Sequence, residues 1–199
     1  MKPIVFAVRV PRDTEEKYSA VFLSAADEKH KKRYSDAKNR DQAYISLVGN
    51  VLSLYALNKT FGLKMSEIKI GYGEKGKPFP EGRSGEKYFF SVSHSGDVCV
   101  CAVSDSEVGV DVERIRDVNA ERIAKRFFSK DEKEYIGSFQ NEYEKKRAFF
   151  TVWTKHESAV KLSGRGISDI SKPIGDEVLS ESTLLFGEYV LTISIFTQM

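Results

Sequence analysis

The sequence of 199 residues has only two cysteines and no long apolar run. Cys99 and Cys101 are two residues apart, so on a strand their side chains share one face and are poorly placed for a disulfide. The sequence contains no C-x-x-C spacing, and a zinc site is therefore not indicated. We expect both cysteines to be small core residues.

No apolar run approaches the roughly 20 residues that a helix needs to cross a bilayer. The first apolar stretch is interrupted by Arg9 and lacks a small-residue cleavage site, so we predict a strand there and not a signal peptide. These features predict a cytoplasmic protein with no membrane partner. The net charge of +2 is too small to indicate a nucleic-acid partner.

Positive charge is nevertheless concentrated early in the chain. The basic side chains of this stretch are Lys29, His30, Lys31, Lys32, Arg33, Lys38 and Arg40. One interpretation is a solvated helix face. The other is a binding surface for a phosphate-rich ligand or an acidic partner. Composition alone leaves both open.

Hydrophobic patterning divides the chain into short elements. We predict strands over residues 4–10, 68–70, 88–93, 98–104, 108–113 and 189–196. We predict helices over residues 24–58, 119–127, 130–139 and 142–162, and a turn-rich segment over 71–85. This order is typical of the α+β class. No exact repeat and no flexible linker is present, so two halves, 1–104 and 105–199, would abut directly.

Two carboxylates stand out on the predicted strand 108–113. Asp111 and Glu113 fall on one face of that strand, while Val110 and Val112 fall on the other. Two like charges side by side repel each other unless a cation or a basic group lies between them. The pattern alone fits an ordinary solvent-facing strand as well as a cation site.

Glu157 and Lys161 are four residues apart on the predicted helix 142–162, so they share a helix face. An exposed ion pair of little energetic value is one interpretation. Three aromatic residues within 149–153 indicate instead that this helix is packed. A carboxylate on a packed helix would complete an oxygen-ligand site for Mg²⁺ with the two strand carboxylates.

His94 lies between two serines at the end of the predicted strand 88–93. The segment lacks the G-x-S-x-G elbow of a hydrolase and has no evident triad partner. A histidine in this setting is either structural or exposed, or it binds a phosphate together with the neighbouring hydroxyl groups.

Five segments resemble the Sfp-type phosphopantetheinyl transferases. They are Gly76-Lys77-Pro78, Phe90 to Gly96, Gly109 to Glu113, Ala124 to Ser129, and Trp153 through Lys161 to Gly166. Each motif is short, but five motifs in this order and at this spacing are highly specific. The resemblance spans roughly residues 27–167.

The resemblance implies a monomeric fold of two α+β halves related by a pseudo-twofold axis, with coenzyme A in the cleft between them. It implies transfer of 4′-phosphopantetheine from coenzyme A to a serine of an apo acyl or peptidyl carrier protein, with release of 3′,5′-ADP. It also implies that Asp111, Glu113 and Glu157 hold Mg²⁺. Glu157, or a water that it orients, takes the serine proton, and Lys161 contacts the phosphate that moves.

The resemblance further implies which residues bind coenzyme A. Ser93 and His94 would hold the phosphates of the nucleotide. Lys77 and Pro78 would lie near the adenine, and Ser46 would meet the 3′-phosphate.

Two positions depart from the family pattern. His156 stands where the family usually has a lysine before the helical glutamate, and we expect it to donate to a phosphate. Ile45 stands where relatives often carry an arginine for the 3′-phosphate. We expect Arg40 or the cluster 29–33 to compensate for that arginine.

Two other hypotheses remain open at this stage. One is a weakened relative that binds coenzyme A or a carrier without transferring the arm. The other is an unrelated metal-dependent phosphoryl-transfer enzyme that uses the same carboxylates. The sequence does not name the carrier, because fatty-acid, polyketide and nonribosomal-peptide systems all present a serine on a similar acidic bundle. We expect such a carrier to dock around Arg116 and the helix 119–128, with Phe127 and Phe128 in the core.

Overall fold

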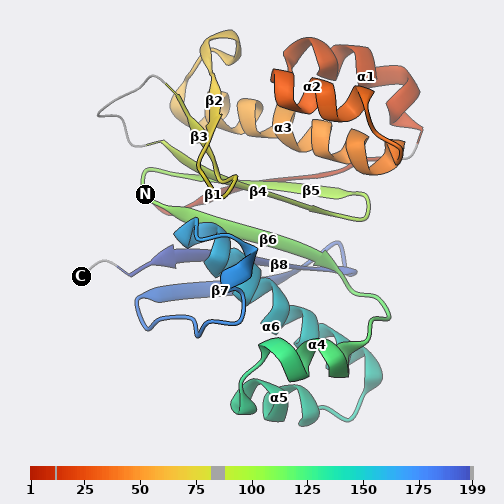
Figure 1. The fold of residues 1–199 in the computed structure, drawn as a ribbon, viewed down its shortest axis with the longest axis vertical. Helices are drawn as coiled ribbons and strands as arrows, with labels where there is room; N and C mark the ends of the chain where they lie inside the picture. Colours follow the sequence, from red (N-terminus) through yellow and green to blue (C-terminus); the bar gives the residue numbers. More distant parts are fainter. Residues whose placement is uncertain (12, 82–87, 198–199) are drawn as a thin grey trace.

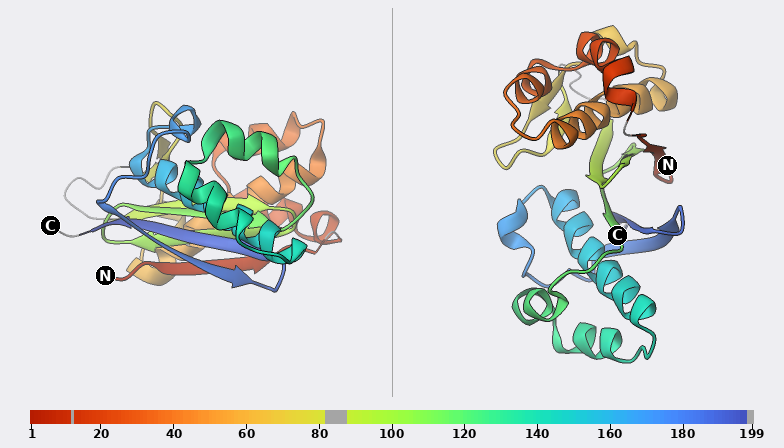
Figure 2. Two further views of the ribbon diagram at one scale, coloured as in Figure 1. Left: turned by 90° about the horizontal axis from the view of Figure 1, so that it is seen from below. Right: turned by 90° about the vertical axis from the view of Figure 1, so that its right-hand side faces the viewer.

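The computed structural model describes residues 1–11, 13–81 and 88–197. Two three-stranded antiparallel sheets lie in the middle of the molecule, and the helices lie at its two ends (Figure 1). Viewed from the side, the helices and sheets form two lobes (Figure 2). The predicted α+β class is confirmed. None of the helices in the described part of the chain has the length and apolarity that a membrane crossing requires.

The first sheet has the strand order β1-β5-β4. Its strands are β1 (Ile4–Arg9), β4 (Phe89–Ser95) and β5 (Val98–Ser104). The central strand β5 is buried along its whole length, because it pairs with a neighbour on each edge and lies under a helix. That helix is α3 (Arg40–Phe61), on which α1 (Thr14–Ala25) and α2 (Glu28–Ser35) pack.

The helical pattern predicted over residues 24–58 is confirmed, but it is divided among separate helices. The chain forms three helices here, and the first already begins at Thr14. Asp27 caps α2 by accepting a hydrogen bond from the main-chain N of His30 at 2.8 Å, and Asn39 caps α3 in the same way. Both caps lie within a polar, basic stretch, so hydrophobic periodicity does not locate them.

A small hairpin follows α3 and a short 3-10 helix, η1 (Met65–Glu67). It consists of β2 (Ile70–Tyr72) and β3 (Pro78–Pro80). The strand predicted over 68–70 is therefore displaced, and part of the predicted turn-rich segment is a strand. Prolines are tolerated in β3 because a two-stranded hairpin leaves one edge without main-chain partners. Residues 82–85 of the predicted turn-rich segment lie outside the described residues.

The second sheet has the order β6-β8-β7, which repeats the order of the first. In each sheet the earliest strand pairs with the latest, and the latest pairs with the strand before it. The strands are β6 (Val108–Arg114), β7 (Val178–Leu185) and β8 (Tyr189–Phe196). The helices are α4 (Ala120–Phe127), α5 (Lys130–Gly137), α6 (Glu142–Ser163) and the 3-10 helix η2 (Ile167–Asp169). The strands and helices predicted between residues 88 and 163 are confirmed, as is the strand 189–196.

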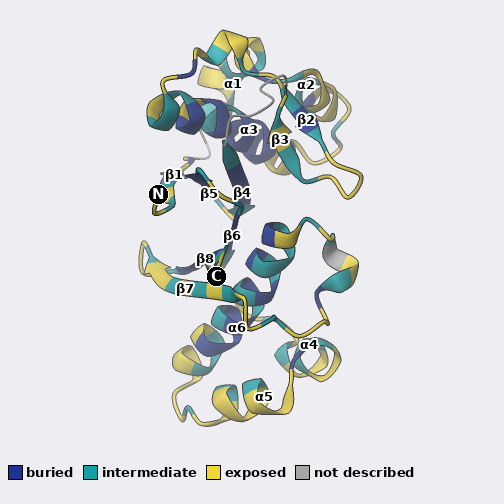
Figure 3. Ribbon diagram, turned by 90° about the vertical axis from the view of Figure 1, so that its left-hand side faces the viewer, coloured by how far each residue is buried: buried dark blue, intermediate teal, exposed yellow. Residues whose placement is uncertain are grey.

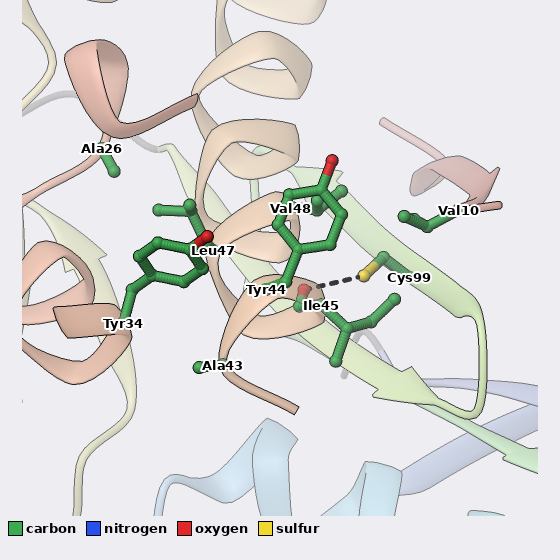
Figure 4. Close-up of a cluster of buried hydrophobic side chains, with 9 residues drawn as sticks. All are labelled: Val10, Ala26, Tyr34, Ala43, Tyr44, Ile45, Leu47, Val48 and Cys99. Carbon is green, nitrogen blue, oxygen red and sulfur yellow. Dashed lines mark hydrogen bonds between the residues drawn. The ribbon is translucent and has the colours of Figure 1, made fainter. Parts of the chain in front are cut away.

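The buried residues are concentrated in the sheets and on the helix faces that cover them (Figure 3). Cys99 lies in a cluster with Tyr44, Ile45 and Val48, where its Sγ donates to the main-chain O of Ile45 at 3.1 Å (Figure 4). Cys101 lies in a second cluster. Burial raises the pKa of both thiols to about 12. The cysteines are core residues, as predicted.

Strands β4 and β6 lie side by side although they belong to different sheets. Ser91 Oγ accepts a hydrogen bond from the main-chain N of Val110 at 3.0 Å, and Ser95 Oγ accepts one from that of Arg114 at 3.2 Å. Alternate hydroxyl groups of β4 therefore satisfy main-chain amides of β6. We call this contact, made by Ser91, Ser93 and Ser95, the serine seam.

Candidate active site

A cleft of about 520 Å³ opens beside the serine seam. It is lined by α2, α3, the β2–β3 hairpin, β4, β6 and α6. The residues predicted from sequence that line it are Ser46, Lys77, Pro78, Ser93, His94, Asp111, Glu113, Glu157 and Lys161. Segments more than one hundred residues apart in the sequence thus meet in one cavity.

Asp111 and Lys161 form the buried centre of the site. Lys161 Nζ donates to Asp111 Oδ1 at 2.8 Å and to Ser93 Oγ at 2.8 Å. Ser93 Oγ in turn donates to the same Asp111 oxygen at 2.7 Å. Lys161 therefore forms its ion pair with Asp111 of β6. The exposed ion pair between Glu157 and Lys161 that the spacing allowed is not formed among the described residues.

Glu113 lies nearer the surface of the same cleft. Its Oε2 accepts a hydrogen bond from Ser95 Oγ at 2.7 Å and one from Arg116 Nη1 at 2.7 Å. Both strand carboxylates are thus engaged by a serine of β4 and by a basic side chain. The predicted repulsion between them is relieved by these contacts.

Glu157 is the least compensated carboxylate of the cleft. Its pKa is raised to about 7, chiefly by burial and then by the negative charge of Asp111, and the positive charge of Lys161 partly opposes both effects. A carboxylate that titrates near neutral pH is well suited to accept and return a proton.

The close contact between α6 and β6 is what brings Glu157 to Asp111. Gly109 on β6 faces the helix, and a Cβ at this position would lie 2.6 Å from the main-chain N of Leu162 and closer still to the main-chain O of Ser158. Only glycine allows this approach. The glycine of the motif Gly109 to Glu113 therefore positions the helical carboxylate beside the strand carboxylates.

The site has one buried oxygen that lacks a protein donor. Asp111 Oδ2 is buried and has no hydrogen-bond partner among the described residues. As the side chains stand, no group of three or more His, Cys, Asp or Glu within the described ranges is arranged to hold a metal ion. Lys161 donates to the other oxygen of Asp111, and Arg116 donates to Glu113 Oε2.

His94 lines the cleft as a neutral side chain. Its pKa is lowered to about 4, chiefly by burial and then by the positive charges of Lys161 and Arg33. At neutral pH its ring can accept or donate a hydrogen bond but carries no charge. Its role in the cleft is therefore that of a polar contact.

Lys77 fixes the hairpin wall of the cleft to the end of α6. Its Nζ donates to the main-chain O of Leu162 at 2.7 Å and pairs with Glu107, and its stem lies against Gly164. Pro78 follows it in β3 and lines the cleft beside it. These contacts place the segment Gly76-Lys77-Pro78 at the cleft wall.

The basic stretch divides between two faces of α2. Lys29, His30 and Arg33 line the cleft, and we call these three residues the basic wall. Lys31 and Lys32 instead pair with acidic side chains on the exposed surface of the same helix. The structure therefore has a solvated face on this helix, as one interpretation expected, and the binding of a phosphate-rich ligand or an acidic partner by the other face stays a prediction.

Two predicted residues do not reach the cleft. Arg40 pairs with Glu15, and its guanidinium lies 4.2 Å from the ring centroid of Tyr34. His156 is buried on the far side of α6, where Nδ1 meets the main-chain O of Ile170 at 2.9 Å and Nε2 meets Glu132 Oε1 at 2.7 Å. Successive residues of a helix are rotated by about 100°, so His156 points away from the face of α6 that carries Glu157.

Three further positions correct or extend the sequence analysis. Ile45 is buried in the core cluster of α3, so it does not line the cleft. Asn50 and Tyr72 do line it, although no pattern in the sequence indicates them. Both are neutral polar residues on elements that only the tertiary fold brings together.

Two family models match consecutive parts of the chain. The model of the family described as "4′-phosphopantetheinyl transferase, N-terminal" matches residues 11–107. The model of the "4′-phosphopantetheinyl transferase superfamily" matches residues 107–190. The boundary between the matches falls in the turn between β5 and β6.

Curated relatives carry the same description. The chain is 38% identical over 124 residues to the 4′-phosphopantetheinyl transferase psf-1 of Bacillus pumilus, covering 62% of the chain and 51% of the relative. It is 27% identical to Sfp of Bacillus subtilis (strain 168), covering 82% and 71%. It is 32% identical to gsp of Aneurinibacillus migulanus, covering 80% and 65%. The match thus spans about half to two thirds of the length of these relatives.

Proposed function

The chain belongs to the 4′-phosphopantetheinyl transferase superfamily, and we propose that it transfers the 4′-phosphopantetheine group of coenzyme A to a serine of an apo acyl or peptidyl carrier protein. The observation that carries this proposal is the convergence of Asp111, Glu113, Glu157 and Lys161 on one cleft with a basic wall. Such a cleft suits a ligand with several phosphates.

In this reaction the serine Oγ of the carrier attacks the phosphorus that bears the pantetheine arm. The bond from that phosphorus to the bridging oxygen breaks, and 3′,5′-ADP leaves with the bond electrons. The serine proton passes to Glu157, directly or through a water, and the raised pKa of Glu157 supports this role. Lys161 contacts the phosphate that moves, because its ammonium already projects into the cleft.

We propose Mg²⁺ as the metal of this site. Hard carboxylate oxygens are its preferred protein ligands, and the buried Asp111 Oδ2 without a protein donor fits a cation. Asp111, Glu113 and Glu157 would hold the ion, which competes with Lys161 and Arg116 for the first two carboxylates. When bound, the ion supplies neutralisation of the charge that develops on the leaving diphosphate oxygen.

The remaining cleft residues bind coenzyme A in this proposal. The basic wall supplies positive charge, and neutral His94 supplies a hydrogen bond to a phosphate oxygen. Ser93 would do the same once its hydroxyl turns away from Asp111 Oδ1. Lys77 and Pro78 form the wall for the adenine, and Ser46 is a hydroxyl contact on α3. Arg40 and His156 have no part in this binding, because their contacts lie elsewhere.

The carrier docks on the surface beside the cleft in this proposal. Arg116 and the exposed basic residues of α4 (Arg122, Lys125 and Arg126) suit an acidic helical partner. Phe127 and Phe128 are not available to a partner, since they pack in the core cluster of the second sheet.

We further propose that residues 1–104 and 105–199 are two halves related by a pseudo-twofold axis and that the protein acts as a monomer. The repeated strand order supports the relation. So does the length of the long helices, since α3 and α6 each have 22 residues. Both halves of the cleft come from one chain, which supports a monomer.

The direct test is intact-protein mass spectrometry of apo acyl and peptidyl carriers incubated with coenzyme A, Mg²⁺ and this protein. We expect a mass gain of one phosphopantetheine group on at least one carrier. The gain should disappear with EDTA and with Asp111→Ala. Transfer that persists in EDTA would refute the metal, and no transfer to any carrier would refute the proposed activity.

A weakened relative that binds coenzyme A without transferring the arm is the alternative. The two departures that motivated it, Ile45 and His156, both lie outside the cleft lining. Transfer is therefore the better supported function. Coenzyme A binding in calorimetry without modification of any carrier would favour the alternative.

A further inference from the structure

Asp27 lies behind the cleft wall and bonds to three of the residues that form it. Its carboxylate contacts His30 of α2, Asn50 of α3 and Tyr72 of β2, all of which line the cleft. Asp27 itself is absent from the lining. One carboxylate thus joins three separate elements of the first half.

The contacts of Asp27 fix the orientation of each partner. Asp27 Oδ1 accepts from the main-chain N and from Nδ1 of His30, both at 2.8 Å. Asp27 Oδ2 accepts from Asn50 Nδ2 at 2.8 Å and from Tyr72 OH at 2.7 Å. Because an ionised carboxylate only accepts, His30 must carry a proton on Nδ1, and the amide of Asn50 has one orientation.

The carboxylate is ionised despite its partial burial. Burial by itself would raise the pKa of Asp27, but the hydrogen bonds from His30 and Tyr72 outweigh it and hold the pKa below its usual range. In turn, burial and the neighbouring negative charge raise the pKa of Tyr72, so its hydroxyl remains a donor.

A second cation of the basic wall depends on the same contact. The ammonium of Lys29 lies 3.3 Å from the ring centroid of Tyr72, a cation–π contact. Since Asp27 holds Tyr72 through its hydroxyl, it also fixes the ring on which Lys29 rests. Removal of the carboxylate would release both His30 and Lys29 from their present positions.

We propose that Asp27 is a positioning residue for coenzyme A, which sets the basic wall in a binding-competent arrangement before the ligand arrives. This inference rests on the proposed function. The side-chain partners of Asp27 lie between residues 30 and 72, whereas the proposed reacting groups lie between residues 111 and 161. Asp27 therefore acts on binding and not on the transfer step.

The test compares Asp27→Asn with Asp36→Asn. Asparagine is a good N-cap, so Asp27→Asn keeps the cap of α2 but cannot accept from all of its present donors. Asp36 lies at the other end of α2, where it pairs with the exposed Lys32, and it is the matched control. The readouts are the Kd of coenzyme A by calorimetry and kcat and KM for carrier modification.

We expect Asp27→Asn to raise the Kd and the KM of coenzyme A about tenfold, which is the scale of one lost charged hydrogen bond, with kcat unchanged within about twofold. Asp36→Asn should match the wild type. Equal affinity of Asp27→Asn and wild type would overturn the inference, and so would a loss of kcat with unchanged KM. A wild-type protein that binds no coenzyme A would instead refute the proposed function.

A second variant separates positioning from folding. Tyr72→Phe removes one donor from outside α2 and leaves the cap intact. We expect a smaller rise in KM, of about threefold, at an unchanged melting temperature. If Asp27→Asn unfolds, an unchanged KM in Tyr72→Phe would overturn the inference.

Discussion

The two sheets share one strand order, but residues 1–104 bring mainly basic side chains to the cleft, whereas residues 105–199 bring three carboxylates and the cation Lys161. The first half supplies the basic wall and the neutral His94, and the second supplies Asp111, Glu113 and Glu157. The strand order of the two sheets is the same. The shared framework thus determines where a side chain can project, and substitution within it determines which chemistry is present.

The two long helices show this difference at matching positions. Each begins after an asparagine cap and ends at a glycine with positive φ, Gly62 or Gly164. Seven residues before that glycine, α6 has Glu157 and α3 has Tyr55, which packs edge-on against Phe6. The framework position that faces the cleft in one half therefore serves packing in the other.

The helices also lie differently on their sheets. Helix α6 lies over β6 and β8, whereas α3 lies mainly over β5 and β4. Gly109, the second residue of β6, permits the contact with α6, and the second residue of β1 is Val5. The glycine on β6 is therefore one reason why α6 lies closely against β6, whereas α3 lies mainly over β5 and β4.

The largest expected effect comes from the matched helix positions. Glu157→Gln should lower kcat for carrier modification by about 10²–10⁴-fold, because glutamine cannot accept the serine proton. Tyr55→Phe, at the matching position of α3, should leave kcat unchanged. Steady-state kinetics measures both variants, and comparable losses would contradict the functional asymmetry of the two helices.

The second largest expected effect tests the close contact between α6 and β6. Gly109→Ala should lower the free energy of unfolding by about 3 kcal/mol or more, because the new methyl group meets main-chain atoms that have no room to move. Gly137→Ala is the control, since a Cβ there meets nothing within 4 Å. Urea denaturation measures both. A tolerated methyl group at Gly109 would remove our explanation of why α6 contacts β6.

A pH effect tests the electrostatic difference between the halves. The folded pKa of His94 is about 4, below its ordinary value of 6.5, so the unfolded chain binds its proton more readily. His94 therefore costs stability as the pH falls from 6.5 to 4, by about 3 kcal/mol in total. His94→Gln should lose less stability than the wild type over this range in urea titrations. If the free energy of unfolding depends on pH in the same way for both proteins, His94 does not cause this loss of stability.

The smallest effect compares the two helix caps. Asn39 accepts one main-chain hydrogen bond at the start of α3, and Asn141 accepts two at the start of α6. We expect Asn39→Ala to cost about 0.5–1 kcal/mol and Asn141→Ala about 1–2 kcal/mol of unfolding free energy. Thermal denaturation checks the order of the two values, and a reversed order would show that packing outweighs capping at these positions.

Much of the fold follows from local patterns, and the site follows from them in part. Short apolar runs bounded by turn residues predict β5 and β8, and helical spacing places Glu157 and Lys161 on one face. The breaks before α2 and α3 escape prediction, since polar caps carry no periodic signal. The contact between Asp27 and Tyr72 escapes it for another reason: 45 residues separate them, and only tertiary packing brings them together.

His156 shows that the position of a residue in a sequence motif does not determine where its side chain points. Its position beside Glu157 predicts a phosphate contact, but adjacent residues on a helix point in different directions. Glu132 and Ile170, which hold the ring on the other side, lie on separate elements. Its partners, and not its neighbour in the sequence, determine its role.

The serine seam has a consequence for biosynthesis. During translation β6 leaves the ribosome long before its sheet partner β8, and an unpaired strand edge is prone to aggregate. The strands of the first sheet have all been synthesised by then. Ser91 and Ser95 can therefore accept hydrogen bonds from the main-chain amides of Val110 and Arg114 at once. We expect the first half to satisfy these β4-facing amides of β6 before β8 is synthesised. Hydrogen exchange on chains truncated before residue 178 should show protected amides at these two positions.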